Sequence, residues 1–295
     1  MLCFSSESLT GWKPNAVRPT PLNRSPFAGH RPPRRPPAEP KPKASDNPVA
    51  LTAEEVAFTR ALVIHEDDSV FVLNKPAGLS SQGGRIQAHT LDDLLWALAR
   101  PGRPRPRLIH RLDRDTSGVI LTARTKPAAS FLGKALMAKR FRKTYLALVA
   151  PGAPEPRGGQ IDAPLRRESI GREAYMRVCP PDHPEAEDAR SRYRTLASNA
   201  TAALVELSPD TGRMHQLRVH MASIGRPISG DSRYGGALML GGTAVPRLML
   251  HAARLVFPHP EGGERRITAP IPSDFQVMLD RLGLAAPEHE PEAAR

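Results

Sequence analysis

Residues 108–122 limit the fold more strongly than any other part of this 295-residue chain. The stretch begins with a dense polar cluster over residues 110–117, and it passes through Gly118 into the apolar, β-branched residues 119–122. This order predicts a loop that leads into a buried strand. A rigid strand holds such a loop in place while the loop exposes its side chains, so catalytic groups are often found there. Asp113 is therefore the first candidate for a catalytic residue.

The chain is strongly basic. It contains 42 Lys and Arg against 30 Asp and Glu, a formal net charge of +12 at pH 7. Such a balance favours a polyanionic partner, because each neutralised phosphate releases its counterions. A basic protein without such a partner would have the same charge, so the charge alone indicates a nucleic acid or another anionic surface.

Cysteine use and hydropathy indicate the compartment. The two cysteines, Cys3 and Cys179, are too few for a disulfide framework or a zinc site of the Cys-x-x-Cys type. The chain has no run of about 18 apolar residues, and it does not begin with a basic segment followed by a long apolar one. We expect a cytoplasmic monomer that has no membrane partner.

Composition divides the chain into three parts. Residues 1–50 hold 11 of the 32 prolines, with eight Lys or Arg and three Asp or Glu, which predicts a disordered basic tail. This tail could contact RNA or be an inert leader, and the sequence leaves both open. Residues 51–285 are expected to form one folded domain, and residues 286–295 a second disordered tail.

Local patterns in residues 51–285 predict alternating helices and strands. Thr52 with Glu55 is typical of a helix start, and Thr90 is the expected cap of an amphipathic helix over residues 90–99. Asp210 or Thr211 is the expected cap of another helix. Two short strands around an acidic turn precede the Lys-Pro-Ala-Gly loop, a further helix covers residues 128–139, and strands cover residues 144–149, 173–178, 192–196 and 202–207.

Several blocks of this chain, in the right order, resemble those of the RluA-type RNA pseudouridine synthases. They span about residues 62–260 and are Asn-Lys-Pro-Ala-Gly at 74–78, His-Arg-Leu-Asp-Arg-Asp-Thr-Ser-Gly at 110–118, Lys-Thr-Tyr at 143–145, Thr-Gly-Arg-Met-His-Gln-Leu-Arg-Val-His at 211–220, Ile-Ser-Gly-Asp-Ser-Arg-Tyr-Gly at 228–235 and Leu-His-Ala-Ala-Arg-Leu-Val-Phe-Pro-His at 250–259. The resemblance implies an α+β fold, in which a mixed, largely antiparallel sheet has peripheral helices and a central RNA-binding cleft. Residues 51–285 would be the catalytic domain.

The activity that this resemblance implies is the isomerisation of specific uridines to pseudouridine in ribosomal RNA, transfer RNA or both. Uracil is detached from C1′ of the ribose, turned, and rejoined through C5. The reaction needs no redox change and no external energy source, which agrees with the lack of a Walker loop and of a Gly-x-Gly-x-x-Gly fingerprint. We therefore expect RNA as the partner, and no metal or cofactor.

The resemblance also implies the catalytic residues. Asp113 would be the carboxylate beside C1′, either attacking it or stabilising the ribosyl intermediate. Arg213 would pair with Asp113, because a buried carboxylate stays ionised only when a cation opposes desolvation. Tyr145 would stack on the uracil and assist proton removal from C5. Arg111 would fill the gap left when the target nucleotide flips out of its stack.

Other residues of these blocks are expected to contact the substrate or orient the loop. Lys75 could approach a phosphate, or it could be a surface lysine in a Pro-Gly turn. Five residues are expected to orient the loop or contact the RNA: His110, His215, Gln216, Arg218 and His220. A buried histidine with satisfied hydrogen bonds is the alternative for each of the three histidines. Asp115 competes with Asp113 for the catalytic role, but the resemblance assigns that role to the aspartate after Arg-Leu, so Asp115 is expected in a turn.

Two other functions stay open from the sequence. One is a non-catalytic RNA-binding or ribosome-assembly factor with the same fold, and the other is a glycosylase that releases the base. The presence of Asp113, Tyr145 and Arg213 together favours the enzyme, because binding alone requires no carboxylate facing a phosphate-rich partner. The chain departs from many family members in lacking an evident S4-type RNA-binding domain, so the blocks do not indicate which RNA is modified.

Overall fold

The computed structural model describes residues 49–83, 89–171 and 173–285. The predicted tails lie outside these residues, apart from residues 49 and 50. Among the helices of these described ranges, none is long and apolar enough to cross a membrane.

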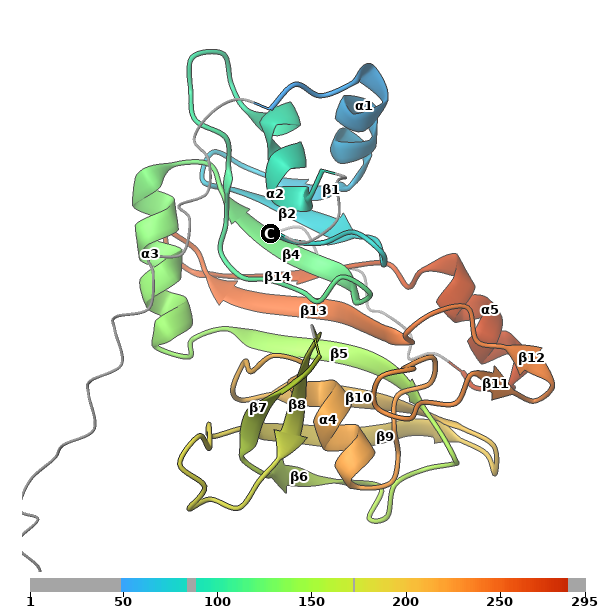
Figure 1. Ribbon diagram of the computed structural model, residues 1–295. Coiled ribbons are helices and arrows are strands. Elements are labelled where there is room, and N and C mark those ends of the chain that lie inside the picture. Colours follow the sequence, from blue (N-terminus) through green and yellow to red (C-terminus); the bar gives the residue numbers. More distant parts are fainter. Residues whose placement is uncertain (1–48, 84–88, 172, 286–295) are drawn as a thin grey trace, which may run out of the picture. The chain divides into compact units, whose positions relative to one another are not determined.

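One large sheet organises the described part of the chain (Figure 1). It has ten strands in the order β1-β2-β4-β13-β5-β10-β9-β6, and β3 and β14 pair with β4 and β13. Neighbours are antiparallel except β4 and β13, which run parallel. The strands are β1 Val63–Glu66, β2 Val70–Lys75, β3 Arg107–Leu108, β4 Ser117–Ala123, β5 Arg142–Val149, β6 Gly158–Asp162, β9 Arg190–Ser198, β10 Ala203–Pro209, β13 Leu250–Pro258 and β14 Glu264–Thr268. Two small hairpins accompany the sheet, β7 Leu165–Ile170 with β8 Glu173–Val178, and β11 Met239–Leu240 with β12 Thr243–Ala244.

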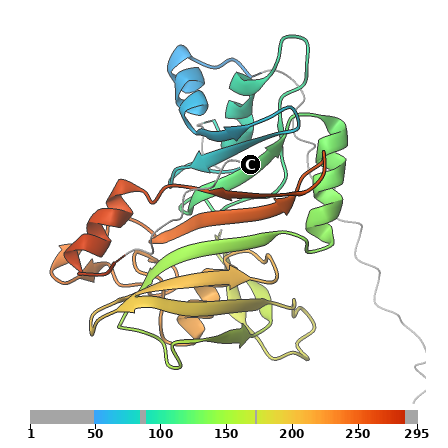
Figure 2. The ribbon, with the colours of Figure 1, turned by 180° about the vertical axis from the view of Figure 1, so that it is seen from behind.

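The helices cover both faces of the sheet (Figures 1 and 2). Alternate residues of a strand point to opposite faces, so Tyr145 and Ala147 of β5 pack on one side and Leu146 and Leu148 on the other. The Tyr145 side is covered by α2 Leu91–Leu94, its 3₁₀ continuation Leu95–Leu98 and α4 Gln216–Ser223. The other side is covered by α3 Lys126–Met137 and α5 Ser273–Arg281.

Helix starts follow the predicted caps in two cases and depart in a third. Helix α1, Ala53–Ala61, has a complete capping box from Thr52 and Glu55, and Thr90 caps α2 in the same way. The prediction for Asp210 or Thr211 was wrong, because α4 begins only at Gln216. The Thr211 hydroxyl donates instead to Gln216 Oε1, which closes a turn before the helix.

The parallel pair β4–β13 places the predicted loop at the centre of the sheet. Gly118 is aligned with Ala252 and has φ +114°, and a Cβ on Gly118 would lie 2.2 Å from the Ala252 carbonyl oxygen. The Ser117 hydroxyl lies 3.0 Å from His251 Nδ1 in the same pair of strands. Only glycine allows this approach, so the strand that follows the Asp113 loop is held tightly against its neighbour.

Candidate active site

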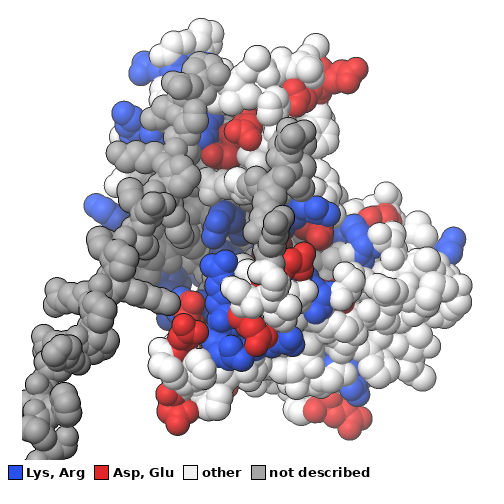
Figure 3. All heavy atoms as spheres, viewed as in Figure 1, with Lys and Arg blue, Asp and Glu red and all other residues white. Residues whose placement is uncertain are grey.

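A cleft of about 1420 Å³ opens over the loop that precedes β4. Figure 3 shows Lys and Arg side chains gathered around a hollow in this face. Three of the lining residues are Asp, and nine are Lys or Arg: Arg111, Arg114, Lys139, Arg142, Lys143, Arg192, Arg213, Arg254 and Arg266. A concave surface with this excess of positive charge attracts a phosphate backbone.

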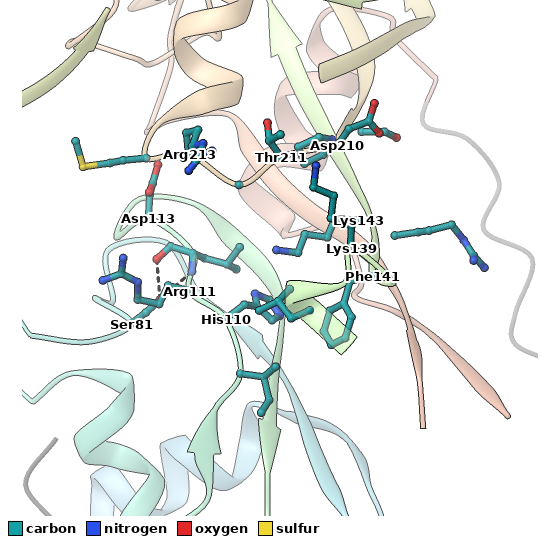
Figure 4. A pocket seen from close by; sticks show the side chains of 18 of the residues that line it. Ser81, His110, Arg111, Asp113, Lys139, Phe141, Lys143, Asp210, Thr211 and Arg213 are labelled. Carbon is teal, nitrogen blue, oxygen red and sulfur yellow. Dashed lines mark hydrogen bonds between the residues drawn. The ribbon is translucent and has the colours of Figure 1, made fainter. Parts of the chain in front are cut away.

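The loop holds Asp113 in the cleft by backbone contacts. The Ser81 hydroxyl donates to the Leu112 carbonyl at 2.7 Å and accepts from the Leu112 N–H at 3.1 Å. The Thr116 N–H donates to the Asp113 carbonyl at 3.2 Å. Figure 4 shows Asp113 projecting from this loop toward the turn that carries Arg213. The Asp113 side chain is 30% exposed, so the carboxylate is open to a ligand in the cleft.

Two donors face one oxygen of this carboxylate. His215 Nε2 lies 3.9 Å and Arg218 Nη1 3.7 Å from Asp113 Oδ2. Arg218 is buried, and its Nε and Nη2 donate to the two carboxylate oxygens of Asp231 at 2.7 and 2.8 Å. The bidentate pair fixes the guanidinium plane while Nη1 stays directed at Asp113.

Arg213 does not pair with Asp113, contrary to the sequence-based expectation. Its Nη1 lies 2.8 Å from Glu187 Oε2, and its Nε donates to the Asp188 carbonyl at 3.0 Å. Arg213 belongs to the turn before α4, whereas Arg218 lies on the helix and points at the loop. The arginine beside Asp113 is therefore Arg218.

Tyr145 lies on β5, in register with Leu207 and Ala252, and follows Thr144, which lines the cleft, without being a lining residue itself. Its side chain is buried, and no described residue forms a hydrogen bond with its hydroxyl. Burial, reinforced by the negative charge of Asp113, raises the pKa of the phenol well above its usual range. Tyr145 therefore stays neutral at neutral pH and can donate a hydrogen bond.

Lys75 is placed where it cannot reach a phosphate. It is fully buried, and its Nζ donates to the carbonyl oxygens of Pro76, Leu79 and Arg114 at 2.8, 2.7 and 3.0 Å. Burial lowers the pKa of this amine to about 7, although the charges of Asp115 and Asp113 act in the opposite direction. Lys75 thus ties the Asn-Lys-Pro-Ala-Gly loop to the residue that follows Asp113.

Gln216 and His110 are also engaged with the protein. Gln216 Oε1 accepts from the Thr211 hydroxyl and the Arg213 N–H, and its Nε2 donates to the Arg190 carbonyl and to Ser191 Oγ. His110 lines the cleft, and its Nε2 accepts from the Leu121 N–H at 3.2 Å. Burial, with the nearby charge of Lys143, pushes the pKa of His110 well below its usual value, so this ring is a neutral acceptor. These contacts support loop-orienting positions for both residues.

Two further predicted residues differ in exposure. Arg111 is exposed and lines the cleft. Asp115 accepts from its neighbour Arg114 at 2.9 Å, in a half-exposed pair at the turn. Asp231 and Tyr234, which stand behind Arg218 and His215, had no predicted role. Their only sequence signal was their place in the block at residues 228–235.

A mixed, largely antiparallel sheet, with a carboxylate that faces a buried arginine in a basic cleft, agrees with the fold and site that the resemblance to the RNA pseudouridine synthases implies. The family model described as RNA pseudouridylate synthase matches residues 69–223, and the chain belongs to this family. It is an enzyme, an isomerase, as predicted.

Relatives and solved structures agree with this assignment. The chain is 39% identical over 241 residues to ribosomal large subunit pseudouridine synthase C of Escherichia coli (strain K12), which covers 79% of this chain and 74% of that protein. It is 34% identical over 250 residues to the protein of the same name from Vibrio parahaemolyticus, over 83% of this chain and 77% of that one. The structure of human RNA Pseudouridylate Synthase Domain Containing 4 matches with a TM-score of 0.69 and 29% identity, over 80% of this chain and 99% of the human one. This match confirms the predicted fold class.

Proposed function

We propose that this enzyme converts one or more uridines of large-subunit ribosomal RNA to pseudouridine, with Asp113 acting at C1′. Support for the substrate comes from the relatives, which are named for the ribosomal large subunit and align with most of this chain. The basic cleft suits a large structured RNA. Ribosomal RNA as substrate agrees with the cytoplasmic location that the sequence predicts.

The orientation of the Asp113 carboxylate carries this proposal. His215 and Arg218 both face Oδ2, so Oδ1 is left to face the ribose. Oδ1 either attacks C1′ or stabilises the positive charge that develops there as the C1′–N1 bond breaks. The donors that face Oδ2 orient the carboxylate.

Tyr145 would contact the detached uracil. Because its pKa is raised, the phenol is protonated at neutral pH. The neutral ring can stack on the base, and its hydroxyl can donate to a uracil oxygen. The base then rotates within the pocket and the C1′–C5 bond forms. C5 loses its hydrogen as a proton to water, and N1, released from C1′, takes up a proton from water, so that the product is an isomer of uridine.

Arg111 would take the place of the flipped nucleotide. A uridine within a stack does not expose both C1′ and C5 to one pocket, so the nucleotide must leave the stack. The exposed guanidinium of Arg111 stands two residues before Asp113 in the loop and can stack on the neighbouring bases.

A pseudouridine map of ribosomal RNA tests the proposal. Cells lacking the gene are compared after complementation with wild type or with Asp113→Asn, which keeps the size of the side chain. We expect one or a few large-subunit sites to lose modification and only the wild type to restore them. An unchanged ribosomal map with a changed transfer RNA map would contradict the substrate, and restoration by Asp113→Asn would contradict the role of Asp113.

A further inference from the structure

His215 has a left-handed backbone conformation, which is uncommon for residues other than glycine. It is the N-cap residue of α4 and has φ 53° and ψ 17°, in the left-handed region, and its side chain makes no capping hydrogen bond. Residues with a side chain seldom adopt this region, although Asn, Asp and His do so more often than most. The backbone alone therefore assigns no role to His215, and the contacts of its ring decide the role.

The ring is held between Tyr234 and Asp113. His215 Nδ1 lies 2.8 Å from the Tyr234 hydroxyl, and the two rings meet edge to face with centroids 5.6 Å apart. On the other side, His215 Nε2 faces Asp113 Oδ2 at 3.9 Å. The His215 side chain is 13% exposed, so little water competes for either nitrogen.

The partners determine which nitrogen carries the proton. An ionised carboxylate only accepts, so the nitrogen that faces Asp113, Nε2, bears the hydrogen. Burial lowers the pKa of His215, although the charge of Asp113 opposes this, and the neutral ring leaves Nδ1 as an acceptor. The Tyr234 hydroxyl then donates to Nδ1, and its oxygen accepts from the Met176 N–H of β8 at 3.0 Å.

We propose that His215, aligned by Tyr234, is a positioning residue that fixes Asp113 Oδ2 so that Oδ1 faces C1′. The proposal deepens the proposed function and rests on it. The chain of donors runs from the Met176 N–H to the Tyr234 hydroxyl and from that hydroxyl to His215 Nδ1, while His215 Nε2 faces Asp113 Oδ2 without reaching hydrogen-bonding distance. Substrate binding closes the 3.9 Å gap to hydrogen-bonding distance, since catalytic contacts are often long in the free enzyme.

Tyr234 also supports the second donor. The Arg218 guanidinium carbon lies 5.0 Å from the centre of the Tyr234 ring, and Asp231 Oδ1 accepts from both Arg218 and the Tyr234 N–H. The ring and the hydroxyl of Tyr234 therefore have separate tasks. Removing only the hydroxyl releases His215 while the ring stays against Arg218.

Two substitutions separate this role from a structural one. Tyr234→Phe removes the hydroxyl alone, and His215→Asn keeps a residue that tolerates the left-handed backbone but is too short to face Asp113. The control is Tyr175→Phe, which removes a hydroxyl bonded to the exposed Glu173 in the neighbouring ring of the same aromatic pair.

The first readout is the single-turnover rate at saturating ribosomal RNA, with the RNA dissociation constant measured beside it. Misplacing a reacting group by a fraction of an ångström slows the chemistry, so we expect both variants to lose roughly 10- to 100-fold in rate with affinity within about 2-fold. Tyr175→Phe should match the wild type. Wild-type rates in either Tyr234→Phe or His215→Asn would overturn the proposal.

The second readout is the tautomer of His215, from ¹⁵N chemical shifts of the imidazole in the wild-type protein without RNA. We expect the Nε2–H form in the wild type, and a mixture of tautomers in Tyr234→Phe. An Nδ1–H tautomer in the wild type would overturn the proposal, whatever the variants do. Because this spectrum needs no activity, an inactive wild type would count against the proposed function and leave the hydrogen-bond chain to be judged separately.

Discussion

Arg218 Nη1 lies 3.7 Å from Asp113 Oδ2, while the same guanidinium forms a bidentate pair with the buried Asp231. The pair with Asp231 sets the plane of the guanidinium, and this plane directs the third nitrogen at the Asp113 carboxylate. Arg213, five positions earlier in the chain, carries the same guanidinium group, but it pairs with Glu187 and not with Asp113. Position on α4, and not residue type alone, decides which arginine faces Asp113.

Substituting lysine for each arginine tests this distinction. Lysine keeps a positive charge but lacks the planar fork, so Arg218→Lys cannot hold Asp231 and face Asp113 at once. We expect its single-turnover rate to fall roughly 10²- to 10³-fold, as on loss of one preorganised donor. Arg213→Lys is the matched control, and its rate should change less than about 10-fold, since exposed ion pairs contribute ~1 kcal/mol or less. A larger loss in Arg213→Lys than in Arg218→Lys would contradict the assignment.

Gly118 allows the close approach of β4 to β13. A Cβ at this position would meet the Ala252 carbonyl oxygen at 2.2 Å with φ +114°, so Gly118→Ala should lower the free energy of unfolding by about 2 kcal/mol or more. Gly133 of α3 is the control, because a Cβ placed there would have no atom within 4 Å and alanine favours a helix by about 1 kcal/mol. Urea unfolding of both variants measures the difference. Equal stability of the two would contradict the steric account.

Because Lys75 is buried, we expect its contribution to the free energy of unfolding to increase with pH. Its pKa is about 7 in the folded protein, below the ~10.4 of an unfolded lysine. Between these values the unfolded chain binds more protons, so the contribution of Lys75 to the free energy of unfolding rises with pH. We expect the wild type to gain stability relative to Lys75→Met between pH 7 and pH 10, measured by denaturant unfolding at several pH values. A difference that is constant over this range would show that Lys75 titrates alike in both states.

Strand β14 offers adjacent arginines on opposite faces. Arg266 lines the cleft and Arg265 does not, because successive strand residues point to opposite sides. If Arg266 contacts one phosphate, Arg266→Gln should weaken RNA binding and reduce the slope of log affinity against log salt by about 1. Arg265→Gln should leave this slope unchanged. Equal effects of both substitutions would mean that general charge, and not the cleft, binds the RNA.

Much of the fold follows from local chemistry that the sequence displays. Capping boxes at Thr52 and Thr90 mark helix starts because the cap and its partner lie three residues apart. Residues 119–122 form the buried strand β4 that their β-branched side chains predict. The match to solved relatives confirms the mixed, largely antiparallel sheet that the motif blocks imply.

The errors concern residues whose partners are distant in sequence. Arg213 and Arg218 belong to the same block. Because α4 begins only at Gln216, Arg213 lies in the turn before the helix and Arg218 lies on the helix, so their side chains point to different partners. In the sequence, Lys75 resembles a surface lysine. In the folded protein its Nζ donates to the carbonyl of Arg114, which is 39 positions away in the chain. The tie between Tyr234 and Met176 joins segments 58 positions apart. The hydrophobic periodicity of a segment predicts its secondary structure, but it does not predict which distant residue a side chain contacts.

Tritium release tests the central claim most directly. Purified protein is incubated with large-subunit ribosomal RNA that carries tritium at C5 of its uridines, because rejoining the base through C5 releases that hydrogen to water. We predict stoichiometric release by the wild type with no loss of free uracil. Asp113→Asn should release at least roughly 10³-fold more slowly while binding the RNA equally well. Release by Asp113→Asn at the wild-type rate would contradict the assignment of the chemistry to this carboxylate.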